Sequence, residues 1–189
     1  MTYIETTSEE HATGETAAIY AGDRERTGYL PNYTKVFSAR PEVYRAWQQL
    51  SAAVRENIDL RRYELATLAA ARRLGSDYCA LAHGSILRER FFEPDALAAV
   101  ARDRRRAGID AADVAVMDLA EKVAGDASSV TEADIERLRE LGLADDEILD
   151  VILAAGIRAF FSKVLAAAGA EPDQAYDELE PDLRRALLP

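Results

Sequence analysis

The sequence predicts an all-α protein, on three observations. Apolar residues recur at helical spacing along most of the chain. Alternating runs rich in β-branched residues, which a sheet needs, are few. Alanine and leucine dominate the 49% of residues that are apolar. Because 189 residues can bury one substantial core, we expect a single helical domain over 1–189, with an N-terminal arm at 1–29 and a C-terminal tail at 170–189.

The first predicted helix runs from Ser8 to Gly22 and is followed by a loop rich in glycine and proline around residues 28–32. A second helix begins at Pro41, which stands at a favourable first helical position. We expect its apolar stripe to face the core. The stripe consists of Val43, Trp47, Leu50 and Val54.

The second half of the chain also reads as helices, after the two helices that carry the candidate site. They are expected at 94–107, 110–125, 131–142 and 145–169, and the two halves show a faint internal duplication. The basic run at 103–106 lies near the end of the first of them and is read as a solvated face, with an anionic cofactor or another subunit as alternatives. Thr131 with Asp134 forms a variant of the capping box. The tail at 170–189 is expected to cross onto a neighbouring subunit or to stay loosely attached.

The candidate site lies in the segment from Glu64 to His83. Glu64 is the only charged residue between 63 and 71, and a lone carboxylate on such an apolar helix needs a partner. Gly75 and Ser76 have the character of a helix end and a helix start, so Cys79 falls in the first turn of the next helix. His83 follows Cys79 by four residues and therefore shares its helix face.

A reactive cysteine acts as a thiolate, which a helix N-terminus and a nearby histidine favour and the neighbouring Asp77 opposes. With ~1.5 Å of rise per residue, Glu64 lies roughly 16 Å before the turn, Cys79 roughly 5 Å after it and His83 roughly 10 Å after it. If the helices fold back on one another, His83 lies between the other two. We therefore expect Glu64 to orient His83 and His83 to activate Cys79.

Other readings of these residues exist. Taken alone, Cys79 fits the role of a small buried hydrophobic residue, and Glu64 fits that of a buried acid paired with Arg61 or Arg72. Together with His83 they also supply three ligands for zinc, but the chain offers no second cysteine and only the distant His11. We expect no metal and no cofactor. Aromatic residues near the site are expected in the core rather than in a pocket: Tyr29, Tyr33, Phe37, Trp47 and Tyr78.

The composition of the chain argues against several classes of binding partner. The formal net charge of -11 argues against nucleic acid and against an anionic membrane surface. No apolar run approaches the ~20 residues that span a bilayer, and the first residues lack a secretion-signal pattern, so a cytoplasmic location is expected. A single cysteine excludes an internal disulfide.

The spacing of Glu64, Ser76, Cys79 and His83 resembles the signature of alkylhydroperoxidase D-like proteins in the carboxymuconolactone decarboxylase superfamily. That signature is a Glu, then Cys-x-x-Cys, then His four residues beyond the second cysteine. Residues 30–47 and 155–169 also resemble the peroxidase-related branch. The resemblance implies an all-helical fold built from a duplicated unit, assembled as a homo-trimer or hexamer with the site near subunit contacts.

Ser76 departs from that pattern, because redox members carry the first cysteine there. The resemblance assigns the peroxide-reactive thiol to Cys79 and proton transfer to Glu64 and His83, with Ser76 and Tyr78 in support. Without a second thiol, oxidised Cys79 needs an external thiol reductant.

Three functions remain open from the sequence. The first is reduction of an organic hydroperoxide at Cys79. The second is acid/base chemistry of the decarboxylase or isomerase type on a small carboxylate or lactone, with His83 and Glu64 moving protons and no need for a thiol. The third is a noncatalytic oligomeric binding protein.

Overall fold

The computed structural model describes residues 2–188, and over that range the chain forms ten α-helices, four short 3-10 turns and no strand. The predicted all-α class is confirmed. The α-helices are α1 (Gly14–Thr27), α2 (Asn32–Val36), α3 (Pro41–Arg55), α4 (Leu60–Arg73), α5 (Asp77–Arg90), α6 (Pro94–Asp103), α7 (Ala111–Asp126), α8 (Glu132–Glu140), α9 (Asp145–Ala168) and α10 (Pro181–Leu187).

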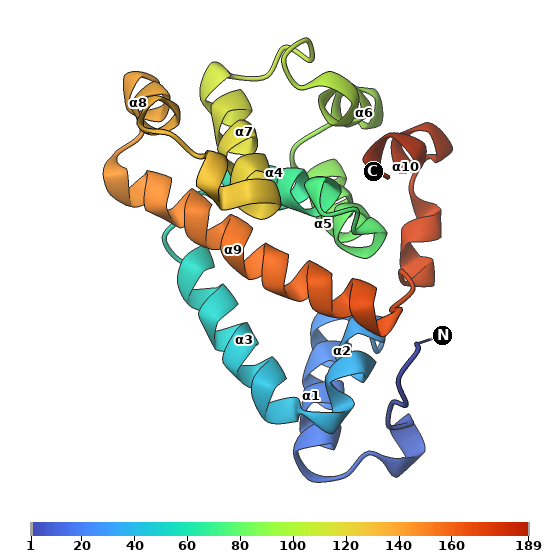
Figure 1. Ribbon diagram of the computed structural model, residues 1–189. Helices are drawn as coiled ribbons and strands as arrows, with labels where there is room; N and C mark the ends of the chain where they lie inside the picture. The colour runs from blue at the N-terminus through green and yellow to red at the C-terminus, as the bar shows by residue number, and fades with distance from the viewer. Residues whose placement is uncertain (1, 189) are drawn as a thin grey trace.

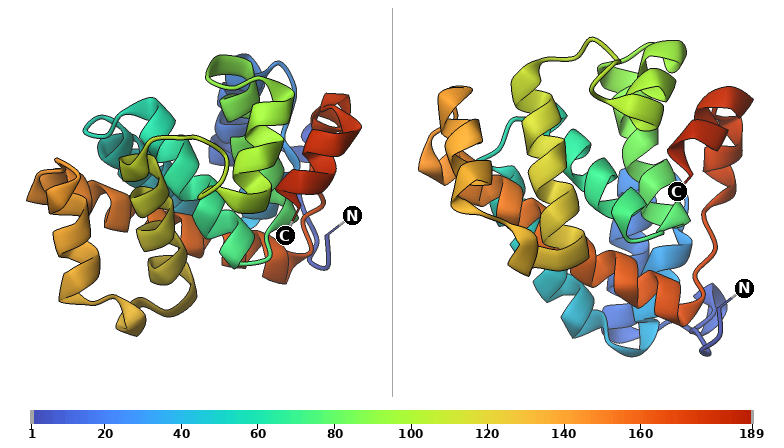
Figure 2. Two further views of the ribbon diagram at one scale, coloured as in Figure 1. Left: turned by 90° about the horizontal axis from the view of Figure 1, so that it is seen from above. Right: turned by 45° about the horizontal axis from the view of Figure 1, so that its top comes forward.

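The helices are arranged around α9, the longest of them, which runs across the molecule (Figure 1). On one side of α9 lie α1, α2 and α3, and on the other lie α4 to α8. The two further views in Figure 2 show the same order, with α10 beside α5 and α6. The candidate site helices α4 and α5 therefore lie against the middle of the molecule.

The centre of the core is α4, because α5, α7 and α9 all pack against it. Leu65, Ala66 and Leu68 have no exposed surface. Burying a leucine completely contributes about 1.5–3 kcal/mol, and the alanines of α4 let the neighbouring helices approach closely. Glu64 is thus carried by the most enclosed helix of the protein.

Several helices begin or end at residues that are typical of helix caps. Asp59 precedes α4 and its carboxylate accepts a hydrogen bond of 2.9 Å from the backbone N–H of Arg62. Gly75 follows α4 with a φ of 66°, a left-handed conformation that favours glycine. The predicted capping box of Thr131 and Asp134 is present at the start of α8.

The first helix differs from the prediction. It begins at Gly14 and continues to Thr27, instead of running from Ser8 to Gly22. The Ser8 hydroxyl is bonded to Nδ1 of His11 at 2.7 Å and makes no helix cap, so residues 9–11 form only a 3-10 turn. The segment called an arm nevertheless contributes Ile19 and Tyr20 to the core.

The helix predicted at 94–107 ends earlier, at Asp103, so the basic run lies in the turn that follows it. Arg104 donates to Asp118 and to Glu121 on α7, and Arg105 pairs with Asp118 at 2.7 Å. These ion pairs bind the turn to α7. Arg104 and Arg105 are therefore partnered within the chain.

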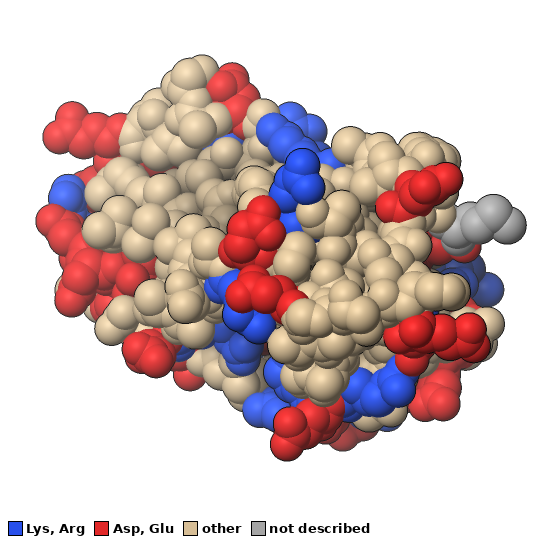
Figure 3. Space-filling model, turned by 90° about the horizontal axis from the view of Figure 1, so that it is seen from below, with Lys and Arg blue, Asp and Glu red and all other residues tan. Residues whose placement is uncertain are grey.

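The predicted stripe of α3 is half right. Val54 is buried, and Trp47 stacks on Phe161 of α9 with ring centroids 4.0 Å apart. Val43 and Leu50 are exposed, because α1 and α9 cover α3 on one side only. Figure 3 views the molecule from the side where α1, α2 and α3 lie and shows uncharged areas separated by groups of charged side chains, which lie along the edge and across the middle of this face.

The C-terminal tail packs on its own chain, so both expectations for it, crossing onto another subunit and loose attachment, differ from the structure. Leu187 is fully buried against Gly84 of α5, where an added Cβ would lie 2.4 Å from its Cδ1. Arg72 of α4 donates hydrogen bonds to the carbonyls of Leu187 at 2.6 Å and Leu188 at 3.1 Å. Arg72 is therefore engaged by the tail.

Among the described residues, α9 alone is long and apolar enough to cross a membrane by length and composition, with a mean hydropathy of 1.8. Half of that window is buried inside the protein. Core helices of soluble proteins show the same property, and α9 contacts α3, α4 and α7.

Candidate active site

The turn between α4 and α5 brings the candidate residues together. After Gly75, the backbone N–H of Ser76 donates to the carbonyl of Ala71 at 3.0 Å, which closes the end of α4. Ser76 then occupies the N-cap of α5, and Cys79 lies in the first turn, as predicted. Because α4 and α5 pack side by side, residues near the start of α4 meet residues one turn beyond Cys79.

Glu64 and His83 form a buried pair. Nδ1 of His83 lies 2.5 Å from Oε2 of Glu64, and Glu64 is only 1% exposed. The ring of His83 also packs edge-on against Tyr63, with centroids 6.3 Å apart. The sequence placed Glu64 beside His83, and the structure shows this contact. Arg61, the alternative partner for Glu64, pairs with Asp113 instead.

Burial lowers the pKa of His83 below its usual value of 6.5, and the positive charge of Arg158 lowers it further, whereas Glu64 opposes both effects. The imidazole is therefore neutral near pH 7. A carboxylate can only accept, so Nδ1 carries the hydrogen and donates it to Glu64. This tautomer leaves Nε2 as an acceptor, which is the form that a proton-accepting base needs.

Cys79 is 1% exposed, and its hydrogen-bond partner comes from α9 rather than from α5. Nη1 of Arg158 lies 3.6 Å from its sulfur. The guanidinium of Arg158 is buried, interacts with the hydroxyl of Tyr63 and lies 5.6 Å from the ring centre of Phe161. Burial acts to lower the pKa of Arg158, but the neighbouring Cys79 and Tyr63 outweigh it, so the pKa is raised and the cation persists.

Arg158 was missed in the sequence. The signal was the one that singled out Glu64: a lone charge on a helix that is apolar on nearly every side, here Ile157 to Phe161. Since its neighbours in space are Cys79 and Tyr63, on α5 and α4, only the packing of α9 onto these helices makes it part of the site.

The surroundings of Ser76 and Tyr78 point to structural roles for both residues. Ser76 is buried at the N-cap of α5 and its side chain makes no cap hydrogen bond. The hydroxyl of Tyr78 donates to the Asp173 carboxylate and accepts from the backbone N–H of Tyr33 at 3.2 Å. Burial raises the pKa of Tyr78, and the Asp173 carboxylate raises it further. Tyr78 therefore ties the tail to α5 and keeps its proton.

Four of the five aromatic residues that the sequence placed in the core form one cluster of ring contacts, Tyr33, Phe37, Trp47 and Tyr78, whereas Tyr29 is only partly buried and takes part in none of these contacts. Tyr33 and Phe37 both pack against Phe161, with centroids 5.6 Å apart in each case. Trp47 joins them from α3, and its Nε1 is buried without a hydrogen-bond partner. Since Phe161 also contacts Arg158, this cluster forms one apolar side of the site's surroundings.

Within residues 2–188 no group of three histidine, cysteine or acidic side chains is arranged to hold a metal ion. His11 is exposed and bonded to Ser8, remote in sequence from Glu64, Cys79 and His83.

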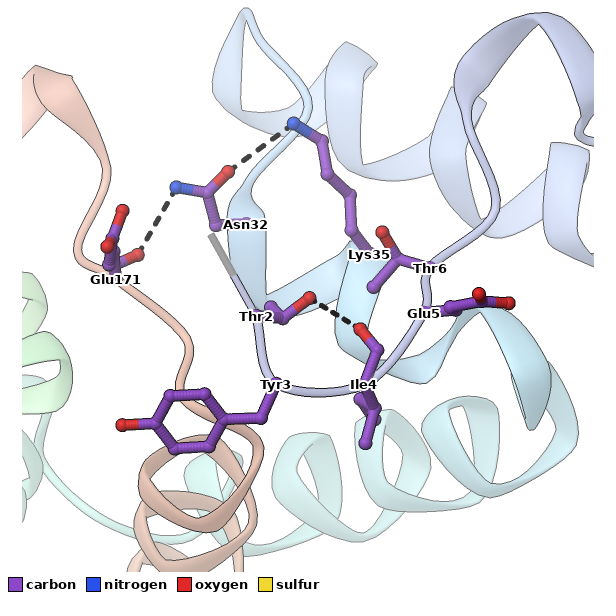
Figure 4. Close-up of a pocket in the computed structure, with 8 residues that line it drawn as sticks. All are labelled: Thr2, Tyr3, Ile4, Glu5, Thr6, Asn32, Lys35 and Glu171. Carbon is purple, nitrogen blue, oxygen red and sulfur yellow. Dashed lines mark hydrogen bonds between the residues drawn. The ribbon is translucent and has the colours of Figure 1, made fainter.

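Two hollows open on the surface near the ends of α9 and α5. One is enclosed by the N-terminal segment 2–6, by Asn32 and Lys35 of α2, and by Glu171, and no candidate residue lines it (Figure 4). The other reaches the start of α5 and is lined by Ser76, Tyr78 and Leu165 among others. Tyr78, the residue before Cys79, lines this second hollow, whereas Cys79 itself does not.

Residues 41–122 match the sequence profile of the carboxymuconolactone decarboxylase family, a range that includes Glu64, Cys79 and His83 and ends before Arg158. No curated protein matches the chain.

Solved structures resemble the chain over nearly its whole length. An uncharacterized peroxidase-related protein from Ralstonia eutropha JMP134, described as an alkylhydroperoxidase AhpD core, aligns with a TM-score of 0.83 and 23% identity over 93% of this chain and 94% of that one. A peroxidase-related protein from Silicibacter sp. TM1040 aligns with a TM-score of 0.84 and 22% identity over 94% of each chain. A cysteine-to-alanine variant of the debrominase Bmp8, in complex with 2,3,4-tribromopyrrole, aligns with a TM-score of 0.76 and 14% identity over 99% of this chain and 96% of that one. At these identities the likeness establishes the fold.

Proposed function

Because residues 41–122 match the carboxymuconolactone decarboxylase family and the fold is that of peroxidase-related proteins, we propose that the chain is a thiol peroxidase of the alkylhydroperoxidase D-like superfamily, which reduces organic hydroperoxides at Cys79 with electrons from an external thiol. The observation that carries this proposal is the surroundings of Cys79. A guanidinium lies against its sulfur, and a neutral imidazole backed by a carboxylate lies one helical turn away. A positive charge favours the thiolate, and the imidazole is in the form that accepts a proton.

The reaction then proceeds in balanced steps. Nε2 of His83 accepts the proton of the Cys79 thiol, and the thiolate attacks one peroxide oxygen. The S–O bond forms as the O–O bond breaks, and the leaving alkoxide takes the proton from His83 to become an alcohol. Cys79 has lost two electrons and is a sulfenic acid. Glu64 keeps the imidazole in the required tautomer throughout.

Ser76 makes the second half of the cycle depend on another molecule. Cys79 is the only cysteine of the chain, so no internal thiol can attack its sulfenic acid. An external thiol forms a mixed disulfide and releases water, and a second external thiol then frees Cys79. The sum is one hydroperoxide and two thiols converted to one alcohol, one water and one disulfide.

The surroundings favour a small or apolar peroxide. Cys79 is enclosed in the main core cluster, and the aromatic cluster around Phe161 lies beside its partner Arg158. An opening lies at the start of α5, where Ser76 and Tyr78 line a hollow. An alkyl hydroperoxide matches these apolar walls better than a strongly hydrated substrate does.

The test is the mass and turnover of the purified protein with cumene hydroperoxide, using glutathione or dithiothreitol as reductant. One hydroperoxide should add one oxygen to Cys79, and the thiol should remove it. Cys79→Ser should gain no oxygen and lose turnover, while His83→Gln should slow oxidation. A wild-type thiol that stays unmodified in excess hydroperoxide excludes the peroxidase.

The acid/base alternative rests on one observation, the neutral His83 hydrogen-bonded to Glu64. It predicts the opposite mutational pattern on a small carboxylate or lactone. Cys79→Ser would keep turnover there and His83→Gln would abolish it. A protein that is inert in both assays and has an unreactive thiol would fit the noncatalytic binding role.

A further inference from the structure

We propose that Arg158 is a catalytic residue: its guanidinium holds the Cys79 sulfur as a thiolate and afterwards holds the oxygen of the sulfenate that forms there. This rests on the proposed peroxidase function and assigns the thiolate to Arg158 rather than to His83. His83 and Glu64 then serve the proton that travels to the leaving oxygen.

The contact geometry is the first argument. Nη1 of Arg158 lies 3.6 Å from the sulfur, within hydrogen-bond range for a sulfur acceptor, whereas Nδ1 of His83 is taken by Glu64. Thiolate sulfur accepts an N–H far better than a neutral thiol does, because the bond is then assisted by both charges. With Arg158 only 5% exposed, water weakens this attraction little.

The charges around the sulfur support the same assignment. Arg158 and Glu64 carry opposite charges in the buried site, with the neutral His83 bonded to Glu64. Arg55 from α3 adds a second positive charge near His83 and lies over the ring of Tyr63 from α4, 5.5 Å from its centre. On the helix of Cys79 itself, Asp77 is exposed to solvent, which screens its charge. The site therefore has positive charge available for one further anion, and a thiolate supplies it.

An unpartnered donor is the second argument. Nε of Arg158 is buried and has no hydrogen-bond partner, and the same is true of the Ser162 hydroxyl one turn further along α9. Residues four apart share a helix face, so both groups lie on the buried side of α9. A buried donor without an acceptor destabilises a fold unless it serves another purpose. An oxygen added to the Cys79 sulfur is an acceptor of the kind that is missing.

In the chemical step Arg158 forms and breaks no covalent bond. Nε2 of His83 first accepts the proton of the thiol, and the thiolate sulfur attacks the peroxide, so that the S–O bond forms and the O–O bonding electrons leave with the alkoxide. The alkoxide takes that proton from Nε2, and the sulfenic acid then gives its O–H proton to the freed Nε2, which leaves a sulfenate. Arg158 keeps its proton, because its pKa is raised. It passes from the thiolate to the sulfenate, both of which are anionic acceptors.

Three variants test the assignment. Arg158→Met removes the charge, Arg158→Lys keeps the charge but loses the planar fork, and Lys163→Met removes an exposed charge from the same helix as a matched control. The rate of alkylation of Cys79 by iodoacetamide is measured from pH 5 to pH 10. We expect Arg158→Met to be half-maximal at a higher pH and to react about tenfold more slowly at pH 7, a factor that corresponds to one pH unit. Arg158→Lys should fall between, and Lys163→Met should match the wild type.

Folding is followed by circular dichroism for each variant. A folded Arg158→Met with the wild-type pH profile overturns the proposal, and a profile that moves only in His83→Gln returns the thiolate to the histidine. If Arg158→Met does not fold, the pH profile of alkylation in Arg158→Lys is compared with that of the wild type instead, and an unchanged profile overturns the proposal.

The sulfenate is tested in the wild type by NMR. The ¹⁵Nε–H signal of Arg158, assigned by its loss in Arg158→Lys, should move when one hydroperoxide is added and return with glutathione. A signal that stays in place while the intact mass gains an oxygen overturns the sulfenate part. If no oxygen is gained, the peroxidase itself fails, and the alkylation profile still decides whether Arg158 holds the thiolate.

Discussion

Replacing the buried carboxylate of the site with an amide of the same shape should destabilise the protein measurably. Glu64→Gln keeps the volume of the side chain in a position that is 1% exposed, so packing changes little. It replaces a charge-assisted hydrogen bond to Nδ1 of His83, at 2.5 Å, with a neutral one. Bonds to charged groups contribute about 1.5–3 kcal/mol and neutral ones about 0.5–1.5 kcal/mol, so the exchange costs about 1–1.5 kcal/mol.

Two further effects change the stability of the Glu64→Gln variant, one adding to this loss and one reducing it. Without Glu64 the positive charges of Arg158 and Arg55 near His83 lose the negative charge that opposes them there. A glutamine is easier to bury than a glutamate, which returns part of the loss. We therefore expect a net loss of about 1–2 kcal/mol, equivalent to roughly 2–8 °C in Tm for a chain of this size.

The assay is urea unfolding followed by circular dichroism at pH 7.5, with Glu15→Gln as the matched control. Glu15 makes an exposed ion pair of 3.0 Å with Arg45, and such pairs contribute about 0–1 kcal/mol. The control should stay close to the wild type. A Glu64→Gln protein as stable as the wild type would refute the reasoning, because it would mean that the site does not need the charge.

Three further predictions concern pH, the tail and the surface. The pKa of His83 is lowered in the folded protein, so the unfolded chain binds a proton at this residue more readily. The free energy of unfolding should therefore be constant above about pH 6.5 and fall as the pH drops below that value, by at most about 1.4 kcal/mol per pH unit. Urea titrations at several pH values should show this slope in the wild type and lose it in His83→Gln. Asp173→Asn weakens the acceptor of Tyr78 and of the Asn32 backbone N–H, so limited proteolysis should cut residues 170–188 faster, and unchanged cleavage would contradict the anchoring role. Leu153 and Phe160 are 40% and 45% exposed on one face of α9, and we propose that this face joins copies of the chain. The double serine variant should lower the molar mass measured by light scattering without loss of helix, whereas a monomeric wild type would exclude that assembly.

Much of the fold and part of the site follow from local sequence. The helices α3 and α8 begin where a proline and a capping box predict, because these signals act on backbone groups a few residues away. The pairing of Glu64 with His83 was also predictable, since a short turn at Gly75 forces α4 and α5 to lie side by side. The early end of α6 was not, because the ion pairs of its basic turn are made with α7.

By itself the sequence determined the helical class, the place of Glu64, Cys79 and His83 on two consecutive helices, and the lack of a second thiol. These are properties of spacing and residue type within about twenty positions. Only the tertiary structure decided that Arg158 lies against the Cys79 sulfur, because the two residues are 79 positions apart and meet through the packing of α9 onto α5. The place of the tail was also decided only by the tertiary structure. Leu187 of the tail contacts Arg72 of α4 and Gly84 of α5, on helix faces that the local sequence pattern identifies only as buried.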